Sequence, residues 1–398
     1  MNKKLKKYGS VFLASSIVVA SLAGCGSKDE SGGSTGGDSK EIKIGMNLEL
    51  SGAVASYGTG IEKGAQLAID EINEDGGIDG KKIKVVKVDN KSDAAEATAA
   101  SIKLATKDKV VAQIGSATSG NTIASVQVAN QNKMPIIGPS ATSEAVTVDA
   151  KSGKVNDYAF RTCFIDPFQG KIAANFATDT LKAKKVAIFA DSSSDYAKGL
   201  AKSFKETIEA AGGEVVAEEA YVAKDTDFKS TLTRLKSKNP DFIYIPGYYE
   251  EVGLIVKQAR NVGIEAPLMG GDGWDSPKLV ELAGADALNK TYFTNHYSAQ
   301  DPDEKIQSFV DAFKGANGDK TPDAFNALGY DTVYWLKDAI ERAGSSKGED
   351  IQKALADTKD LALVTGNFSL DENHHPVKTA TVLEFKDGEQ VFNSKVNP

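Results

Sequence analysis

The feature that most constrains the fold is a regular alternation of short apolar runs with longer amphipathic segments, which begins at Ile42. The apolar runs predict strands, and segments with apolar residues three or four positions apart, such as Ile69 and Ile72, predict helices. Strands are predicted over 42–48, 82–88, 110–114, 134–137, 185–189, 215–221 and 242–245. Helices are predicted over 60–73, 94–106, 121–131, 167–181, 196–211, 228–237 and 251–261. Repeated β-α-β units imply parallel sheets that helices cover on both faces.

The alternation falls into two series, which we interpret as two doubly wound lobes of an α/β protein. A chain of 398 residues exceeds the roughly 250–300 residues at which a single core stops growing, so two lobes are expected. The C-terminal part differs, with helices predicted over 302–316 and 324–343 and short strands over 364–368, 380–385 and 390–393. These strands are too few for a third domain, so we expect the tail to cross back between the lobes.

The first forty residues predict an export signal and a membrane anchor. Four lysines precede a short apolar stretch over 11–22, which is typical of a signal peptide. The stretch ends in Leu22-Ala23-Gly24-Cys25, which resembles the lipobox of bacterial lipoproteins. That resemblance implies a signal peptide over 1–24, lipidation of Cys25 and anchoring by acyl chains. Residues 25–40 then form a Gly/Ser-rich flexible tether. The alternative is an ordinary secretory peptide that happens to contain a cysteine.

Charge and cysteine content exclude other classes of protein. The formal net charge of −8 repels phosphate backbones, so nucleic-acid binding is not expected. Besides Cys25 the chain has one cysteine, Cys163. A disulfide between them would join a flexible leader to the folded body, which we do not expect. Cys163 lies in an apolar run and is interpreted as a small buried hydrophobic residue.

Enzyme signatures are weak, so we predict no catalytic residues, no metal site and no cofactor. The glycine-rich segment 58–64 resembles a dinucleotide loop, and Asp89 ends the next strand. A true fingerprint begins directly after its strand, whereas here about ten residues intervene. We therefore interpret 58–64 as a helix start packed on the sheet. The three histidines, His296, His374 and His375, show no metal-ligand spacing.

Residues that follow the predicted strands point to a ligand. Ligands of open α/β sheets bind at the carboxyl ends of the strands. In the first lobe these positions hold small hydroxyl residues at helix starts, within 51–58, 115–122 and 138–142, which suit a carboxylate. In the second lobe they hold tyrosines and Asp272, which suit a cation. Each of these residue groups alone is also common in helix caps and turns. Together, groups that suit a carboxylate in one lobe and a cation in the other predict that the ligand is an α-amino acid.

The chain from Ile42 onward resembles the leucine/isoleucine/valine-type binding proteins of ATP-driven amino-acid importers. The matching stretches are Leu50-Ser51-Gly52 with Tyr57-Gly58, Gly64-Ala65 with Ile72-Asn73, Gly76-Gly77-Ile78, Ile114-Gly115, Pro139-Ser140-Ala141-Thr142, Tyr244 with Gly247-Tyr248, Asp227-Phe228, and Gln258-Ala259-Arg260 with Gly263. The resemblance implies two Rossmann-like lobes, joined by three crossovers, that close like a hinge on the ligand (the type I periplasmic-binding-protein fold). It implies one lobe from 41–160 plus 296–376 and another from 161–295 plus 377–398.

The resemblance also implies a set of ligand-binding residues. Ser119, Ser140 and Thr142 would hold the α-carboxylate, with Ala141 beside them, and the Ser140 carbonyl and Thr142 hydroxyl would also help to bind the amine. Asp272 would pair with the ammonium. Tyr57 and Phe325 would form walls of the side-chain pocket, and Tyr196 and Tyr248 would contact the ligand from the other lobe.

Three departures from the family pattern concern the choice of ligand. Asp272 stands where many members have a glutamate, so the acid reaches one methylene less far. Trp274 is bulkier than the residue expected there, and the disulfide of some members is missing. Asp275 does not match a binding position and is expected to contribute little.

We therefore predict a protein on the outer face of the cytoplasmic membrane that captures an amino acid and delivers it to an ABC permease. Branched-chain amino acids are the predicted ligands. A receptor for another small polar or aromatic solute, such as an amide, stays open as an alternative. So do an extracytoplasmic enzyme built on the same lobes and a structural surface lipoprotein.

Overall fold

The computed structural model describes residues 40–397. The predicted signal peptide, Cys25 and all but the last residue of the tether lie outside the described residues. Within them, no helix has the length and apolar character needed to cross a membrane.

The first series of strands forms one parallel sheet, in the order β2-β1-β3-β4-β5. Its strands are β1 (Glu41–Leu48), β2 (Lys82–Asp89), β3 (Ala112–Ile114), β4 (Ile136–Gly138) and β5 (Ala159–Arg161). Consecutive residues of β1 are buried from Ile44 to Leu48, because helices cover both faces of the sheet. These include α1 (Ala55–Glu74), which packs on α11 (Ala324–Ala343), and α2 (Ala94–Ile102), which packs on α3 (Ser119–Asn132). We call the part built on this sheet lobe 1.

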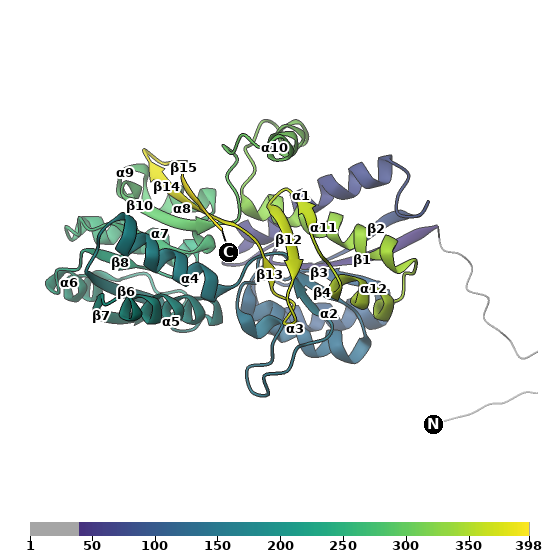
Figure 1. Cartoon of the computed structure of the whole chain (residues 1–398), viewed down its shortest axis with the longest axis horizontal. Coiled ribbons are helices and arrows are strands. Elements are labelled where there is room, and N and C mark those ends of the chain that lie inside the picture. Colours follow the sequence, from purple (N-terminus) through teal and green to yellow (C-terminus); the bar gives the residue numbers. More distant parts are fainter. Residues whose placement is uncertain (1–39, 398) are drawn as a thin grey trace, which may run out of the picture. The chain divides into compact units, whose positions relative to one another are not determined.

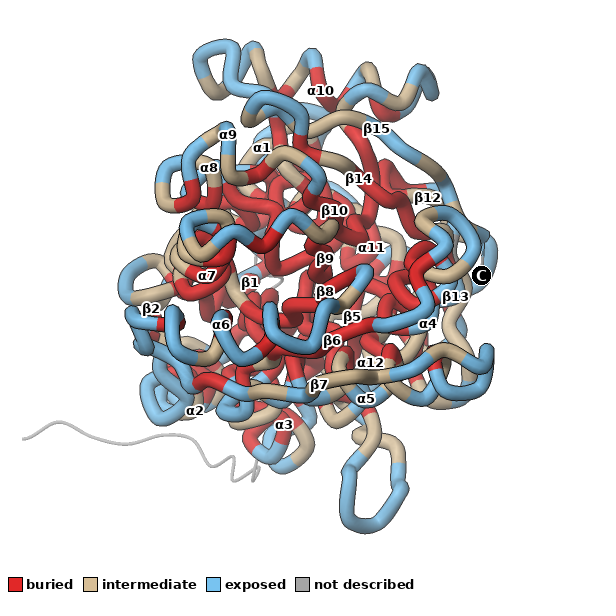
Figure 2. Tube along the Cα trace, turned by 90° about the vertical axis from the view of Figure 1, so that its left-hand side faces the viewer, coloured by how far each residue is buried: buried red, intermediate tan, exposed pale blue. Residues whose placement is uncertain are grey.

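The second series forms a larger sheet, in the order β15-β14-β10-β9-β8-β6-β7, and we call the part built on it lobe 2. Its strands are β6 (Lys185–Asp191), β7 (Glu214–Tyr221), β8 (Phe242–Tyr244), β9 (Leu268–Gly270), β10 (Thr291–Asn295), β14 (Ala380–Lys386) and β15 (Glu389–Val396). Only β14 and β15 run antiparallel to their neighbours. Its helices are α4 (Asp166–Asn175), α5 (Asp195–Ala210), α6 (Lys229–Ser237), α7 (Tyr249–Asn261), α8 (Pro277–Ala283) and α9 (Ala285–Leu288). Figure 2 shows the central strands β8, β9 and β10 of this sheet buried, whereas β7 and β15 at its two edges are partly exposed.

The chain passes between the two sheets three times, as Figure 1 lets the reader follow. The first crossover follows β5, the second follows β10, and the third follows β13. Between the second and third crossovers, lobe 1 gains α10 (Glu304–Ala316), α11, α12 (Gly348–Ala356) and a small sheet of β11 (Leu361–Leu363), β12 (Gly366–Leu370) and β13 (Pro376–Val377). The predicted α/β fold with two doubly wound lobes and three crossovers is confirmed. The lobe boundaries at 160/161, 295/296 and 376/377 stay a prediction, which limited proteolysis would test.

The predicted elements differ from the structure mainly in their ends and in the shortest strands. Helix α1 begins at Ala55, five residues before the predicted start, which places Tyr57 in its first turn. The strands β5 and β9 were not predicted, because their three residues are not part of a longer apolar run, and β10 was missed because polar residues interrupt its run. The short elements α8, α9, α12, β11 and β13 were not predicted either.

Candidate ligand-binding site

Seven of the nine predicted ligand-binding residues line one buried cavity between the lobes. They are Tyr57, Ser119, Ser140, Tyr196, Tyr248, Asp272 and Phe325, and Ala117, Thr118 and Gly273 complete the lining. The carboxyl ends of the parallel strands in both sheets face this cavity, as expected for an open α/β fold. Its volume is about 10 Å³, which is room for roughly one water molecule. A solute the size of an amino acid therefore enters only when the lobes or the lining side chains move apart.

Aromatic rings from both lobes form the apolar wall of the cavity. Tyr57 stacks on Phe325 with ring centroids 4.3 Å apart, and Tyr248 stacks on Tyr196 at 5.2 Å. The Tyr57 ring also meets the edge of Tyr248 at 5.7 Å. Burial raises the pKa of the Tyr57 hydroxyl well above its usual value, so this group stays protonated. It donates a hydrogen bond of 2.5 Å to the carbonyl of Gly273 in the other lobe.

The glycine-rich segment that follows Tyr57 brings α1 close to its neighbours. A Cβ on Gly58 would lie 2.2 Å from the carbonyl oxygen of Glu49, and one on Gly64 would lie 1.8 Å from that of Asn326. Both glycines are therefore needed for helix packing. Asp89 accepts hydrogen bonds from the backbone of Leu50 and Ser51, and its role is to hold that loop. These contacts give the glycines a packing role, as predicted, although the partners are Glu49 and α11 and not the sheet.

Lobe 1 presents the start of α3 to the cavity. The first-turn N–H groups of a helix have no intrahelical acceptor, so the backbone of α3 from Ser119 onward favours an anion. The Ser119 hydroxyl accepts a hydrogen bond from the Ser143 N–H at 3.1 Å, which leaves its own hydrogen for a ligand. The Ser140 hydroxyl instead donates to the carbonyl of Ala117 at 2.8 Å, so it offers the ligand only lone pairs in this arrangement.

Glu49 holds the start of α3 in place, and no sequence pattern indicated this role. Its carboxylate is fully buried and accepts hydrogen bonds from the N–H groups of Ala117 and Thr118, at 2.9 and 3.2 Å. It also accepts from the Thr118 hydroxyl at 2.9 Å and the Asn121 amide at 2.7 Å. Four donors occupy about all the acceptor sites of a carboxylate. Glu49 therefore shapes the start of α3 without facing the ligand.

Ala141 and Thr142 are the two predicted residues that do not line the cavity. The Ala141 carbonyl accepts a hydrogen bond from Arg161 at 2.8 Å. Thr142 is buried beside Asp166, in the first turn of α4. Burial raises the pKa of the Asp166 carboxyl well above its usual value, and the Thr142 hydroxyl acts in the opposite direction. Direct contact of these two residues with a ligand stays a prediction.

Lobe 2 presents a buried acid, Asp272, at the end of β9. Its Oδ1 accepts a hydrogen bond from the Gln169 amide at 3.0 Å, and its Oδ2 lies 3.1 Å from His296 Nε2. The side-chain oxygen Oε1 of Gln169 in turn accepts from the Asp272 N–H at 3.0 Å. Gly273, next in the chain, donates its N–H to the Tyr196 hydroxyl at 2.9 Å. The acid is therefore fixed in the cavity wall by neutral groups.

Trp274 does not reshape the cavity. Its side chain is fully buried, and its ring nitrogen donates to the carbonyl of Ile245 at 3.1 Å. A Cβ on Gly270 would lie 1.9 Å from that nitrogen, so the glycine leaves the space that the indole fills. The departure at this position belongs to the core of lobe 2.

Asp275 is not the minor residue that the sequence suggested. It is buried, and its Oδ2 accepts from the Ala324 N–H at the start of α11 in lobe 1 and from the Asn295 amide, both at 2.8 Å. Its Oδ1 accepts from Gln390 at 2.7 Å. Asp275 thus joins the two lobes in this closed arrangement. Further interlobe bonds support it, among them Tyr57 to Gly273, Tyr249 to Ala53, and Ser56 to Ser276.

The histidines and Cys163 show no metal-binding arrangement. Among residues 40–397, no group of three or more His, Cys, Asp or Glu side chains is placed to hold a metal ion. Cys163 is buried, as predicted, and burial raises the pKa of its thiol to about 12. His374 stacks on Phe160 at 4.3 Å, and His375 is also buried. Sequence reasoning did not identify His296 as a functional residue, although it follows β10 at the same sheet edge as Asp272.

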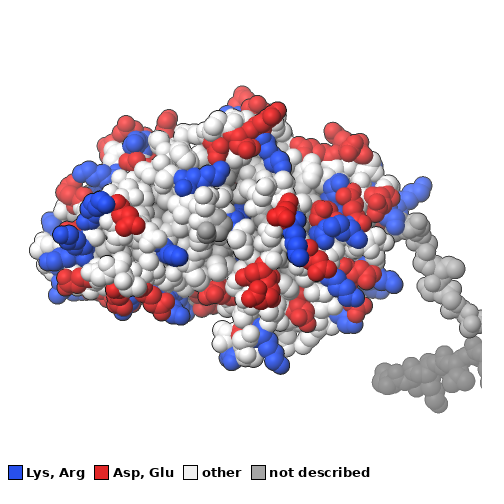
Figure 3. Space-filling model, in the orientation of Figure 1, with Lys and Arg blue, Asp and Glu red and all other residues white. Residues whose placement is uncertain are grey.

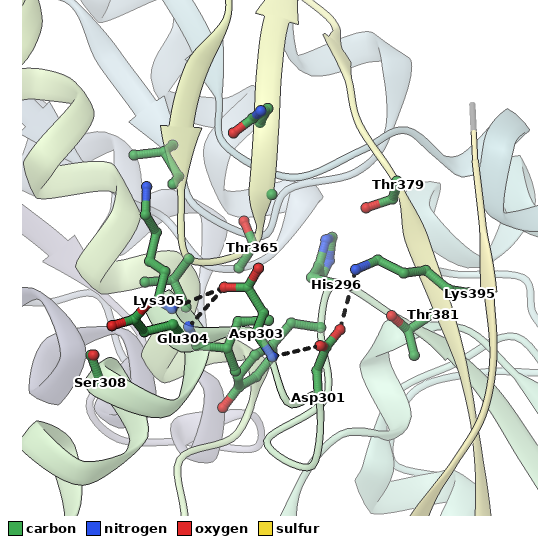
Figure 4. A pocket seen from close by; sticks show the side chains of 16 residues that line it. His296, Asp301, Asp303, Glu304, Lys305, Ser308, Thr365, Thr379, Thr381 and Lys395 are labelled. Atoms are coloured by element: carbon green, nitrogen blue, oxygen red, sulfur yellow. Dashed lines mark hydrogen bonds and ion pairs between the residues drawn. The ribbon is translucent and has the colours of Figure 1, made fainter.

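A second and larger cavity, of about 810 Å³, lies beside the second and third crossovers (Figure 4). Several of its charged groups have partners within the protein: Lys395 pairs with Asp301 at 3.2 Å, and Asp303 accepts from the N–H of Lys305 at 2.9 Å. The Lys305 amine donates to the carbonyl of Ala362 at 3.0 Å. The smaller cavity, where buried groups from both lobes converge, is therefore the candidate ligand site. On the face in Figure 3, acidic and basic side chains are interspersed.

Comparisons with known proteins agree with this geometry. A model of the periplasmic binding protein family matches residues 41–390. A Leu/Ile/Val-binding protein of Rhizobium johnstonii is 35% identical over 334 residues, which are 83% of this chain and 88% of that protein. A branched-chain amino acid transporter substrate-binding protein of Streptococcus pneumoniae, solved with isoleucine, has 45% identity and a TM-score of 0.84, covering 90% of this chain and 100% of that one. A solute-binding protein from R. palustris, solved with benzoate, has 27% identity and a TM-score of 0.79, covering 90% and 97%.

Proposed function

The chain belongs to the periplasmic binding protein family, and from this premise we propose that it captures a free branched-chain amino acid between its lobes and delivers it to an ABC permease. The family and these relatives are solute-binding proteins, not enzymes. The class of ligand follows from the residues that line the cavity.

The observation that carries the proposal is the buried Asp272 carboxylate in the cavity wall, opposite the start of α3. A buried charge is costly unless an opposite charge pairs with it. The partners of Asp272, Gln169 and His296, are neutral donors, so the ammonium of an amino acid supplies the missing charge. The N–H groups of α3 and the Ser119 hydroxyl suit its carboxylate.

The rest of the cavity wall favours an apolar side chain. Tyr57, Phe325, Tyr196 and Tyr248 present aromatic rings, and the charged group that lines the cavity with them is Asp272. With the ammonium bound to that acid, a charged side chain on the ligand would be buried without a partner, which disfavours it. Leucine, isoleucine and valine are therefore the preferred class.

An aromatic acid such as benzoate is the second candidate, because a protein of the same fold was solved with it. The aromatic walls would suit its ring. Its carboxylate, however, brings no positive charge to Asp272, and like charges in a buried site repel each other. The acid therefore favours the amino acid.

Isothermal titration calorimetry and thermal unfolding with a panel of solutes test the proposal. The panel holds leucine, isoleucine, valine, lysine, glutamate, asparagine, acetamide and benzoate. At 100 times its dissociation constant a true ligand adds about 2.7 kcal/mol of stability. We expect the three branched-chain amino acids to bind most tightly and to be recovered unchanged. Stabilisation by benzoate or acetamide alone would support the alternative receptor, and turnover would support an enzyme.

A protein of this family works outside the cytoplasm, and we propose that lipidated Cys25 anchors it to the outer face of the cytoplasmic membrane. The support is the lipobox-like sequence Leu22-Ala23-Gly24-Cys25. Cys25→Ala should leave an unprocessed precursor without acyl label in fractionated cells, whereas Cys163→Ala should be labelled like wild type. Labelling and processing of the Cys25 variant would contradict the anchor.

A further inference from the structure

His296 lies where the second crossover leaves β10, and its ring reaches back to the ligand site. Its Nε2 is 3.1 Å from Asp272 Oδ2, and both side chains are buried. The imidazole also stacks on Phe164, in the first crossover, with ring centroids 3.8 Å apart. In Figure 4 the His296 side chain lies between Thr365 and Lys395, in the wall of the larger cavity. His296 therefore connects two hinge crossovers to the acid in the cavity wall.

The hydrogen bond fixes which nitrogen of His296 carries the proton. An ionised carboxylate only accepts hydrogen bonds, so Nε2 must donate to Asp272. The other nitrogen, Nδ1, is buried without a partner among the described residues. Burial is the main cause that lowers the pKa of His296, although Asp272 acts in the opposite direction, so the ring is neutral near pH 7. A neutral histidine leaves the Asp272 charge available to a ligand.

A purely structural side chain would not need this arrangement. An apolar residue at the same place would stack on Phe164 and would avoid the free-energy cost of an unpaired buried nitrogen. What the imidazole adds is one donor on Asp272 Oδ2, matched by the Gln169 donor on Oδ1. With each oxygen held once, the carboxylate keeps acceptor sites on both oxygens for a ligand.

We infer that His296 is a positioning residue for ammonium recognition: its Nε2–H holds the Asp272 carboxylate in the orientation that receives the amino group of the ligand. The inference rests on the proposed function, in which the ligand is an amino acid. With this role of His296, recognition of the ammonium depends on a crossover between the lobes and not only on the sheet of lobe 2.

Calorimetry with isoleucine on four variants tests the inference. His296→Leu keeps an apolar contact with Phe164 but loses the donor, and we expect binding about tenfold to hundredfold weaker. His296→Gln carries an amide donor at about the reach of Nε2, and we expect it to stay within roughly threefold of wild type. In the Asp272→Asn background, His296→Leu should cause little further loss, because residues that act through one contact are not additive.

His374→Leu is the matched control, since His374 is another buried histidine that stacks on a phenylalanine and does not contact Asp272. It should leave isoleucine binding within about threefold of wild type. Should His296→Leu fail to fold, His296→Asn, whose amide is too short to reach Asp272, takes its place. Wild-type affinity in His296→Leu, or equal additive losses with and without Asp272, would overturn the inference. Failure of the wild type to bind any amino acid would instead overturn the proposed function.

Discussion

Glu49 of lobe 1 and Asp272 of lobe 2 are both buried near the cavity, and their carboxylates are satisfied differently. Glu49 in lobe 1 accepts four hydrogen bonds, all from the segment that starts α3. Asp272 in lobe 2 accepts two, one on each oxygen. A carboxylate has about four acceptor sites. Three of the Glu49 donors share Oε1 and one binds Oε2, so Glu49 has at most one site to spare, whereas Asp272 has one on each oxygen. The comparison teaches that the number of unfilled acceptor sites separates a structural acid from a binding acid.

The largest expected effect follows from replacing the binding acid. Removing one partner of a buried, hydrogen-bonded charge pair costs roughly 2–5 kcal/mol, so Asp272→Asn should weaken isoleucine binding by about 1.5 to 3.5 powers of ten. The unfolding temperature without ligand should change little, because Asn has nearly the same shape and the neutral His296 ring can carry its proton on Nδ1, so that Nε2 accepts from the new amide. Calorimetry measures the loss, and Asp286→Asn, an exposed acid of the same lobe, is the control. Binding within a few-fold of wild type would place the ammonium elsewhere.

Replacing the structural acid should give the opposite pattern. Glu49→Gln brings an amide donor against the N–H groups of Ala117 and Thr118, and we expect it to lower the free energy of unfolding by about 2–3 kcal/mol. Chemical denaturation without ligand measures this loss, with exposed Glu74→Gln in α1 as control. If Glu49→Gln were as stable as wild type but bound no isoleucine, the distinction between the two acids would fail.

Asp275 offers a third, intermediate case, because its carboxylate joins the lobes. Asp275→Asn keeps one acceptor oxygen but places an amide near the donors of Ala324, Asn295 or Gln390. We expect isoleucine binding to weaken by about 1–2 kcal/mol, less than for Asp272→Asn, since only closure is affected. Small-angle scattering with saturating isoleucine should show a larger fraction of open protein than for wild type. A loss as large as that of Asp272→Asn would argue that Asp275 contacts the ligand.

The smallest expected effect concerns pH. Asp323, at the start of α11 in lobe 1, lies near Asp275 of lobe 2; burial, and then the charge of Asp275, raise the pKa of Asp323 to about 8. Burial raises the pKa of Asp275 as well. A raised carboxyl pKa disfavours the charged form, so closure takes up protons and is favoured at lower pH.

The isoleucine dissociation constant should therefore rise a few-fold between about pH 6 and pH 8 and level off above that. Asp323→Asn should flatten this rise, because it removes the titrating group, and asparagine is as good a helix N-cap as aspartate. Calorimetry across this pH range measures both proteins. Equal pH dependence in the variant and the wild type would assign the proton uptake to other groups.

The architecture was predictable because it depends on local patterns. The alternation of apolar runs and amphipathic segments identified the long elements. The family resemblance, together with the rule that ligands bind at strand ends, pointed to nine residues, of which seven line one cavity. The strands β5 and β9 were missed because their three residues are not part of a longer apolar run, and β10 was missed because polar residues interrupt its run. With β10 unrecognised, His296 had no visible place at the sheet edge.

The sequence by itself determined the order of strands and helices, and with it which residues reach the cavity edge of each sheet. Only the tertiary structure decided what each acid does. The donors that fill Glu49 lie 68 to 72 positions away along the chain, and Gln169 lies 103 positions from Asp272. Sequence patterns carry helix and strand periods over a few residues, whereas a buried polar group takes its partners from wherever the fold brings a donor within about 3 Å. The family resemblance separated Asp272 from Asp275, but only the structure shows what Asp275 does: Asp272 faces the cavity, whereas Asp275 binds the start of α11.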